Sequence, residues 1–236
     1  KMKKYIFGKR DSIHIIDLTQ TLELINIALE KVYKVISENG KILFISTKKQ
    51  AAEAIAELAK DTDQFYVNHR WLGGMLTNWG TISNSIKKLE KINLDLVSEN
   101  RGFTKKELLK MSVKRDKLQK SLGGIYEMKK VPDLVFVIDT NYESLAIKES
   151  VKLGIPIIAI LDSNSDPEGI DFPIPGNDDA RRSIDLYCNL IKETIESAKK
   201  ELPSSPTVNT EKNLVKKESE DTKNKAKNKK DNSSIN

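Results

Sequence analysis

The sequence predicts an α/β protein built on a doubly wound parallel sheet, with two long helices inserted into it. The first observation is a set of short, uninterrupted apolar runs rich in Ile, Val and Phe, which are typical of strands buried on both faces. The second is that segments with the spacing of amphipathic helices separate these runs. The third is that residues 77–122 have helical periodicity and no strand pattern.

The apolar runs and the helical segments alternate along the chain. The expected strands are residues 42–46, 65–67, 134–138 and 155–161. The expected helices are residues 19–38, 48–60, 142–153 and 178–200. Because strands that alternate with helices pair in parallel and receive helices on both faces, this order favours a three-layer sheet domain.

Three capping patterns mark expected helix starts, each with a Thr followed three residues later by Glu or Gln. They are Thr47 with Gln50, Thr104 with Glu107, and Thr140 with Glu143. Two of them directly follow an expected strand. They therefore fall where strand-to-helix turns occur, at the carboxyl edge of a parallel sheet.

Residues 77–122 interrupt the alternation. Apolar residues recur there at three- and four-residue spacing in two runs, which are Ile82, Ile86, Leu89, Ile92 and Leu96, then Leu108, Met111, Leu118 and Leu122. Residues 100–103 read as a loop between them. We expect an antiparallel coiled-coil hairpin with a narrow apolar seam. The alternative is two helices packed flat on the sheet domain.

The carboxyl-terminal end differs in composition from the rest. Residues 199–236 contain ten lysines and six acidic residues, so they contribute +4 of the formal net charge of +6. They contain almost no large apolar side chains, and residues 201–236 are therefore expected to be a disordered, lysine-rich tail. The remaining residues are nearly balanced in charge, so any basic surface on the folded part must be local.

Several protein classes are disfavoured. The single cysteine, Cys188, excludes an internal disulfide framework and is expected to be buried in a helix. No apolar stretch is long enough to span a bilayer, and the chain does not open on a leader pattern, so a cytoplasmic location is expected. No dinucleotide or phosphate-loop motif occurs. The two histidines, His14 and His69, form no metal motif, so no cofactor or metal is expected.

The segment Arg70–Asn78 is the most informative stretch for function. It combines the cation Arg70, the indole of Trp71, the pair Gly73 and Gly74, and the polar side chain of Asn78. An exposed Trp beside an Arg would offer a stacking face and a phosphate-binding fork, and the glycines would allow close backbone approach. These features indicate RNA contact.

Further cations indicate the same chemistry. Lys48 and Lys49 follow Thr47 at the start of an expected helix, where a bound phosphate would offset their unfavourable interaction with the helix dipole. Two lysines extending into water are the alternative. The same two interpretations apply to Arg181 and Arg182, where phosphate binding is indicated more weakly. The opening residues add cations suited to RNA backbone contact, unless they form a mobile terminus, namely Lys3, Lys4, Lys9 and Arg10.

Three motifs together resemble a known family. Residues 40–51, 70–78 and 174–183 are similar, in this order, to the S-two family of bacterial small-subunit ribosomal proteins, and the likeness covers residues 1–198. The resemblance implies a flavodoxin-like, three-layer α/β domain with a coiled-coil hairpin, and a structural role in the small ribosomal subunit. It also implies further residues ahead of Lys1, with a Gly-His-containing segment.

The resemblance further implies partners and site residues. The partners would be small-subunit ribosomal RNA and neighbouring ribosomal proteins, including the large mRNA-binding protein called S-one. RNA contact would fall on the Thr47–Lys49 turn, on Arg70–Asn78 and on Arg181 with Arg182, with no catalytic residue.

We therefore expect an RNA-binding α/β domain formed by residues 1–76 and 123–200, a hairpin at 77–122 and a tail at 201–236. Two other functions remain open. A nucleotide- or sugar-phosphate-binding enzyme would use a pocket at the carboxyl edge, where Asp139, Asp162 and Asp166 lie near expected strand ends. A protein-interaction scaffold would bind a partner through the hairpin, without RNA.

Overall fold

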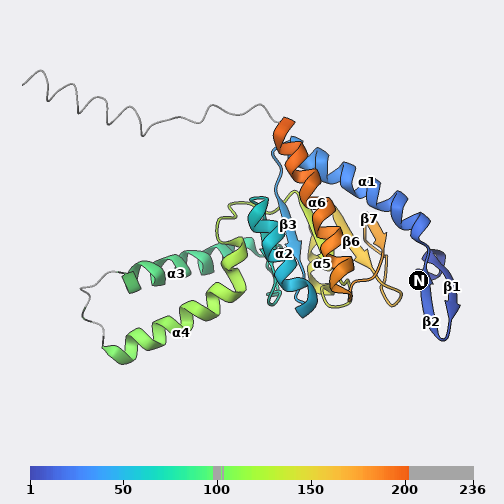
Figure 1. Cartoon of the computed structure of the whole chain (residues 1–236). Coiled ribbons are helices and arrows are strands. Elements are labelled where there is room, and N and C mark those ends of the chain that lie inside the picture. Colours follow the sequence, from blue (N-terminus) through green and yellow to red (C-terminus); the bar gives the residue numbers. More distant parts are fainter. Residues whose placement is uncertain (98–101, 103, 202–236) are drawn as a thin grey trace, which may run out of the picture. The chain divides into compact units, whose positions relative to one another are not determined.

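A computed structural model of the 236-residue chain describes residues 1–97, 102 and 104–201 (Figure 1). Residues 1–201 form one compact unit. The tail expected beyond residue 201 lies outside the described residues, apart from Glu201 itself. Within the described part, no helix combines the length and the apolar character needed to cross a bilayer.

The centre of the fold is a five-stranded parallel sheet with the strand order β4-β3-β5-β6-β7. Its strands, in chain order from β3 to β7, are Ile42–Ile45, Phe65–Val67, Leu134–Ile138, Ile157–Leu161 and Phe172–Pro175. Numbered along the chain, this order is 2-1-3-4-5, the order of flavodoxin-type doubly wound sheets. The structure thus confirms an α/β fold with a parallel sheet.

The fifth strand, β7, was not expected from the sequence. It contains Pro173 and Pro175, and proline normally argues against a sheet because it cannot donate a backbone hydrogen bond. β7 lies at the edge of the sheet and pairs only with β6, so these missing donors are tolerated.

The chain begins with a short 3-10 helix, η1 (Met2–Tyr5), and a two-stranded antiparallel hairpin, β1 (Ile6–Arg10) and β2 (Ile13–Ile16). The hairpin was also unexpected, because charged side chains hide its strand pattern. Asp11 and Ser12 both have positive φ, which is the geometry of the two-residue turns that match the twist of a hairpin.

Helices cover both faces of the sheet. On one face, α1 (Leu18–Ser37), α2 (Lys49–Asp61) and α6 (Arg181–Glu201) pack on side chains such as Phe44, and Figure 1 shows α2 and α6 in front of the strands. On the other face, α5 (Ser144–Leu153) packs with the segment around Met75. Neighbouring residues in β3 point to opposite faces, as the pleat requires.

Of the three expected capping boxes, only one forms. Thr104 caps α4 and exchanges hydrogen bonds with Glu107 in both directions, which confirms that prediction. The prediction at Thr47 is wrong, because Lys48 is the residue that precedes α2 and it makes no side-chain capping bond. The prediction at Thr140 is also wrong. Its hydroxyl is buried without a partner, and α5 begins only at Ser144.

The two long helices expected in residues 77–122 are present as α3 (Trp79–Val97) and α4 (Lys105–Leu122), and they pack against each other. Within the described residues, α3 buries an apolar stripe that includes Leu89, whereas α4 buries only Leu122. A short 3-10 helix, η2 (Gly123–Ile125), then brings the chain against β4. Of the expected loop, residues 100, 101 and 103 lie outside the described residues.

Candidate functional site

The segment Arg70–Asn78 does not present its indole to solvent. Trp71 is only 8% exposed, and its Nε1–H donates a hydrogen bond to Glu149 at 3.0 Å. The prediction of an exposed stacking face at Trp71 is therefore wrong, because a buried carboxylate on α5 captures the one polar group of the ring. Arg70, Gly73 and Asn78 are exposed.

Glu149 organises the whole segment. Its Oε1 also accepts the Gly74 N–H at 2.8 Å, and its Oε2 accepts the N–H groups of Leu76 and Thr77 at 3.0 and 3.1 Å. The Thr77 hydroxyl donates to the same oxygen at 3.2 Å. Glu149 is buried, yet both of its carboxylate oxygens are satisfied by donors from one loop.

These contacts explain the ionisation of Glu149. Burial alone would raise the pKa of this carboxyl, but the hydrogen bonds from Trp71 and from the loop N–H groups outweigh it and hold the pKa below its ordinary value. The loop is consequently fixed by an ionised template, with Gly74 in the left-handed region at φ 81°. It presents a rigid backbone surface rather than a flexible one.

Lys48 lies at the carboxyl edge of the sheet and does not extend into water. Its Nζ forms ion pairs with Asp139 at 3.2 Å, with Asp178 at 2.8 Å and with Asp179. Its side chain is only 11% exposed. The interpretation of Lys48 as a lysine that extends into water is therefore wrong, and its contact with phosphate stays a prediction. Carboxylates that follow β5 and β7 already neutralise it.

The contacts in this ion cluster shift the pKa values of its members. Burial would lower the pKa of Lys48, but its hydrogen bonds to Asp178, Asp179 and Asp139 raise that pKa above its ordinary value. Burial raises the pKa of Asp178 despite the hydrogen bond from Lys48. Lys48 thereby ties the start of α2 to the ends of two strands.

Two neighbouring carboxylates complete this edge. Glu143 is buried and accepts the Thr47 N–H at 2.6 Å, and burial raises its pKa. Carboxylate oxygens of Asp162, Asp178 and Asp179 lie within 4.8 Å of one another, close enough to share a cation. Lys48 already supplies a cation to two of the three.

The other expected site residues differ in exposure. Lys49 is exposed beside the partly buried Lys48. Arg181 and Arg182 are both exposed, and Arg181 pairs with Glu53 at 3.0 Å across the α2–α6 groove. Thr47 is partly buried. Asn177 holds the turn before α6, because its side-chain oxygen accepts the N–H groups of residues 179 and 180.

The expected cations near the amino terminus remain accessible. Lys3, Lys4, Lys9 and Arg10 are all exposed, on η1 and on the β1–β2 hairpin. Tyr5, the aromatic residue among these cations, is buried, with the Lys4 ammonium 4.7 Å from its ring centre. The surface is therefore cationic without a free aromatic at that position.

Sequence reasoning missed Glu149 and Glu143. The signal for Glu149 was present, because it lies three residues after Ala146 on the face that α5 buries, next to Ser150. An acidic residue on the buried face of an amphipathic helix requires internal donors. What the sequence could not supply was the identity of those donors, which lie more than 70 residues earlier.

Comparison with known proteins identifies the family. A family model described as "Ribosomal protein S2" matches residues 1–198. A protein of Agrobacterium fabrum named "Small ribosomal subunit protein uS2" is 58% identical over 191 residues, which cover 81% of this chain and 75% of the relative. Proteins of the same name from Parvibaculum lavamentivorans and Rickettsia rickettsii are 54% and 56% identical over 195 residues. The alignment with the Parvibaculum lavamentivorans protein covers 83% of this chain and 77% of that relative. The alignment with the Rickettsia rickettsii protein covers 82% of this chain and 66% of that relative. The chain belongs to the ribosomal protein S2 family.

Proposed function

We propose that the chain is a structural constituent of the small ribosomal subunit, where it binds ribosomal RNA and supports translation in the cytoplasm. The observation that supports this most strongly is the family match over residues 1–198, together with relatives that are named small ribosomal subunit proteins. The role is structural rather than catalytic, and no cofactor or metal is invoked.

RNA contact would use the cations that the fold leaves accessible. These are Lys3, Lys4, Lys9, Arg10, Lys49, Arg70 and Arg182. The chain would dock electrostatically and would read the shape and phosphate positions of folded RNA rather than its sequence. Because Glu149 holds the Arg70–Asn78 loop rigidly, the exposed Gly73 and Asn78 would meet the RNA backbone without a cost for ordering the loop.

The members of the expected site whose polar groups bond within the chain would act indirectly. Trp71 and Gly74 would shape the loop through Glu149, and Lys48 would brace the turn that displays Lys49. Thr47 and Arg181 would serve the same bracing role through Glu143 and Glu53. Their replacement would weaken RNA binding by disturbing the surface rather than by removing a contact.

The finer organisation is part of the same proposal. Residues 1–76 and 123–200 would form the RNA-binding domain, and α3 with α4 would form a coiled-coil hairpin within residues 77–122. Recruitment of S-one and contact with neighbouring proteins would use apolar surface. Phe7 and Ile13 on the β1–β2 hairpin are 78% and 69% exposed, and Leu18 at the start of α1 is 73% exposed, which suits a protein partner.

Binding of the purified full chain to small-subunit ribosomal RNA at several salt concentrations tests this function. We expect tight, salt-dependent binding, with each phosphate-contacting cation that is removed reducing the slope of log affinity against log salt by about 1. The test variants are Arg70→Ala and Lys49→Ala. The matched control is Lys34→Ala, an exposed lysine in the last turn of α1. Equal affinities and slopes for test and control variants would contradict the assignment.

The alternative of an enzyme at the carboxyl edge has less support. Asp139 and Asp178 are engaged by Lys48, and Asp139 also accepts the N–H groups of Asn141 and Tyr142. These contacts describe a braced turn. Stabilisation of the chain by nucleotides in a thermal-shift assay would favour the enzyme instead.

A further inference from the structure

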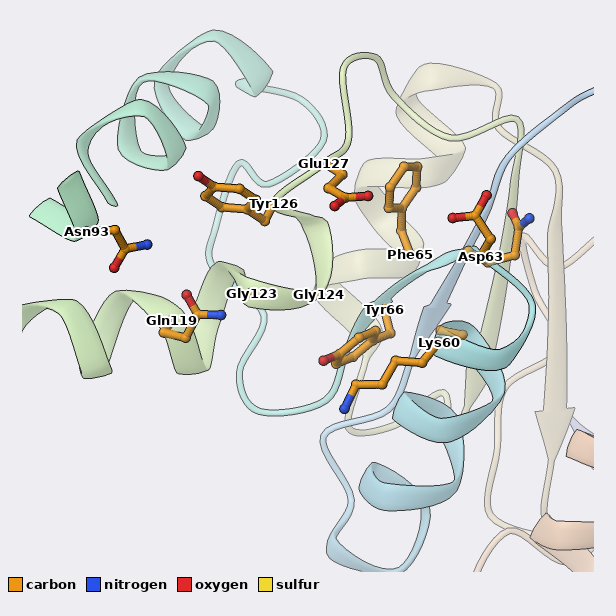
Figure 2. Close-up of a pocket in the computed structure, with 12 residues that line it drawn as sticks. Lys60, Asp63, Phe65, Tyr66, Asn93, Gln119, Gly123, Gly124, Tyr126 and Glu127 are labelled. Carbon is orange, nitrogen blue, oxygen red and sulfur yellow. The ribbon is translucent and has the colours of Figure 1, made fainter. Parts of the chain in front are cut away.

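A cavity of about 460 Å³, with both polar and apolar lining, lies where the edge strand β4, the end of α2 and the base of the α3–α4 pair meet (Figure 2). None of the functions assigned above uses it. It is walled by side chains from α2, β4, α3, α4 and the residues after η2, and it belongs to the size range of ligand sites in proteins. Cavities assembled from several rigid elements keep their shape on binding.

Glycines keep the main chain close to β4 on one side of this cavity. An added Cβ at Gly124 would collide with the Tyr66 carbonyl oxygen and ring, and one at Gly123 would lie 2.8 Å from the Gln119 side chain. Because neither glycine has a side chain, η2 approaches β4 closely without filling the space beside it. The cavity therefore depends on this glycine pair.

The cavity walls combine flat rings with amide groups. Tyr66 and Tyr126 supply aromatic rings, and Asn93 and Gln119 supply amides that can both donate and accept. In Figure 2 the Tyr126 hydroxyl is directed toward the side on which Asn93 and Gln119 lie. Within the described part of the chain, none of these three side chains has a hydrogen-bond partner.

The composition of the walls argues against a peptide anchor. The only aliphatic side chain among the lining residues is the methyl group of Ala59. Grooves that bind amphipathic helices or apolar side chains are lined by larger aliphatic residues. A flat ring with a polar edge is the ligand that aromatic faces and free amides complement.

Cations stand at the rim. The Lys60 ammonium lies 5.9 Å from the centre of the Tyr66 ring, and Lys60 makes no ion pair within the described residues. An adjoining cavity shares Asp63, Phe65 and Glu127 with the first one and adds Lys129, which is exposed. A nucleotide needs this combination of a ring-binding interior with phosphate-binding cations at the entrance.

We propose that this cavity receives an unpaired nucleobase of the ribosomal RNA, which is extruded from the RNA surface and stacks on Tyr126. The inference deepens the proposed function and rests on it. Asn93 and Gln119 would bond the edge of the base, and Lys60 would meet an adjacent phosphate. The site adds a base contact to an interface otherwise formed with the RNA backbone.

Base-specific chemical probing of small-subunit ribosomal RNA, with and without the full chain, tests the proposal. We expect one or two single-stranded bases whose pairing edges become protected by the wild type. The double variant Asn93→Ala with Gln119→Ala should expose those bases again while every other protection remains. The matched control is Asn26→Ala, an exposed amide on α1, which should keep all protections.

The stacking contact has its own pair of variants. Tyr126→Ala should weaken RNA binding roughly tenfold, as expected for one lost base-stacking contact. Tyr126→Phe keeps the ring and should retain most of that affinity. An unfolding curve for each variant separates loss of the contact from loss of the fold, and the double amide variant supplies the test if Tyr126→Ala does not fold.

Four results would overturn the proposal. Unchanged protections in the double variant would show that no base enters the cavity. Saturable binding of a free nucleoside monophosphate, lost in the double variant, would identify a free nucleotide as the occupant. Loss of a protein partner by the same variant, with RNA protection intact, would identify a protein as the occupant. If the wild type binds the RNA but protects no base, this proposal falls while the proposed function stands. If the wild type does not bind the RNA at all, the proposed function falls as well.

Discussion

The replacement Glu149→Gln should release the Arg70–Asn78 loop. One carboxylate oxygen becomes an NH₂ group, which faces donors instead of accepting from them. If it takes the Oε1 position, the Trp71 and Gly74 donors lose their acceptor. If it takes the Oε2 position, the Leu76 and Thr77 N–H groups lose theirs. At least two inward-facing donors are left unpaired in either arrangement.

The size of the effect follows from this count. An unpaired buried donor costs about 1–3 kcal/mol, so two of them lower the free energy of unfolding by about 4 kcal/mol. For a chain of this length, such a loss corresponds to a melting temperature lower by roughly 10 °C. The chemical difference between the two side chains is one oxygen for one nitrogen, so packing volume barely contributes.

Urea and thermal unfolding at pH 7 measure the loss. Glu193→Gln, the same replacement at an exposed position of α6, serves as control and should change stability by less than about 0.5 kcal/mol. A Glu149→Gln variant as stable as this control would refute the conclusion that a buried carboxylate fixes the loop.

Four further results are expected. Because the pKa of Glu149 is lower in the folded state, its contribution is present above the pKa of the unfolded chain and is lost as pH falls through the folded value. The stability difference between wild type and Glu149→Gln, measured by urea unfolding, should therefore shrink below about pH 4.5, and a constant difference would contradict this. Lys48→Met leaves three carboxylates uncompensated and should lower the free energy of unfolding by about 3–5 kcal/mol. Lys49→Ala should lower it little. Equal losses for the two variants in urea unfolding would show that the ion cluster does not stabilise the fold. Thr104→Ala should cost about 1 kcal/mol through the lost cap. Thr140→Val removes a buried hydroxyl that lacks a partner and should not lower the melting temperature, so a loss there would reveal a partner.

The sequence predicts the α/β fold well because buried parallel strands leave continuous apolar runs. The strands at 65–67 and 134–138 agree with the structure to the residue. The prediction at 155–161 begins two residues early, because Ile155 and Pro156 precede β6. β7 was not predicted from the sequence, because its two prolines are tolerated only in an edge strand. Whether a strand lies at the edge depends on the pairing of the whole sheet.

The candidate site was less predictable, because it depends on contacts between distant segments. Nothing near Trp71 in the sequence shows that Glu149 binds its ring nitrogen. Likewise, nothing near Lys48 shows that Asp139 and Asp178 surround its ammonium. Local patterns report which chemical groups a segment contains. Only the fold determines which of those groups bond to other parts of the chain. Here Lys48, an expected RNA-binding cation, and Trp71, an expected stacking ring, both bond to internal carboxylates.

The central claim is that this chain works as a part of the small ribosomal subunit. Sedimentation of the tagged full chain from a cell lysate through a sucrose gradient, at low and then at high salt, tests it most directly. We predict migration with the small subunit at both salt concentrations, because a folded interface with positioned contacts resists salt better than loosely attached charge. A peak near the top of the gradient, at the size of the free chain, would contradict the claim.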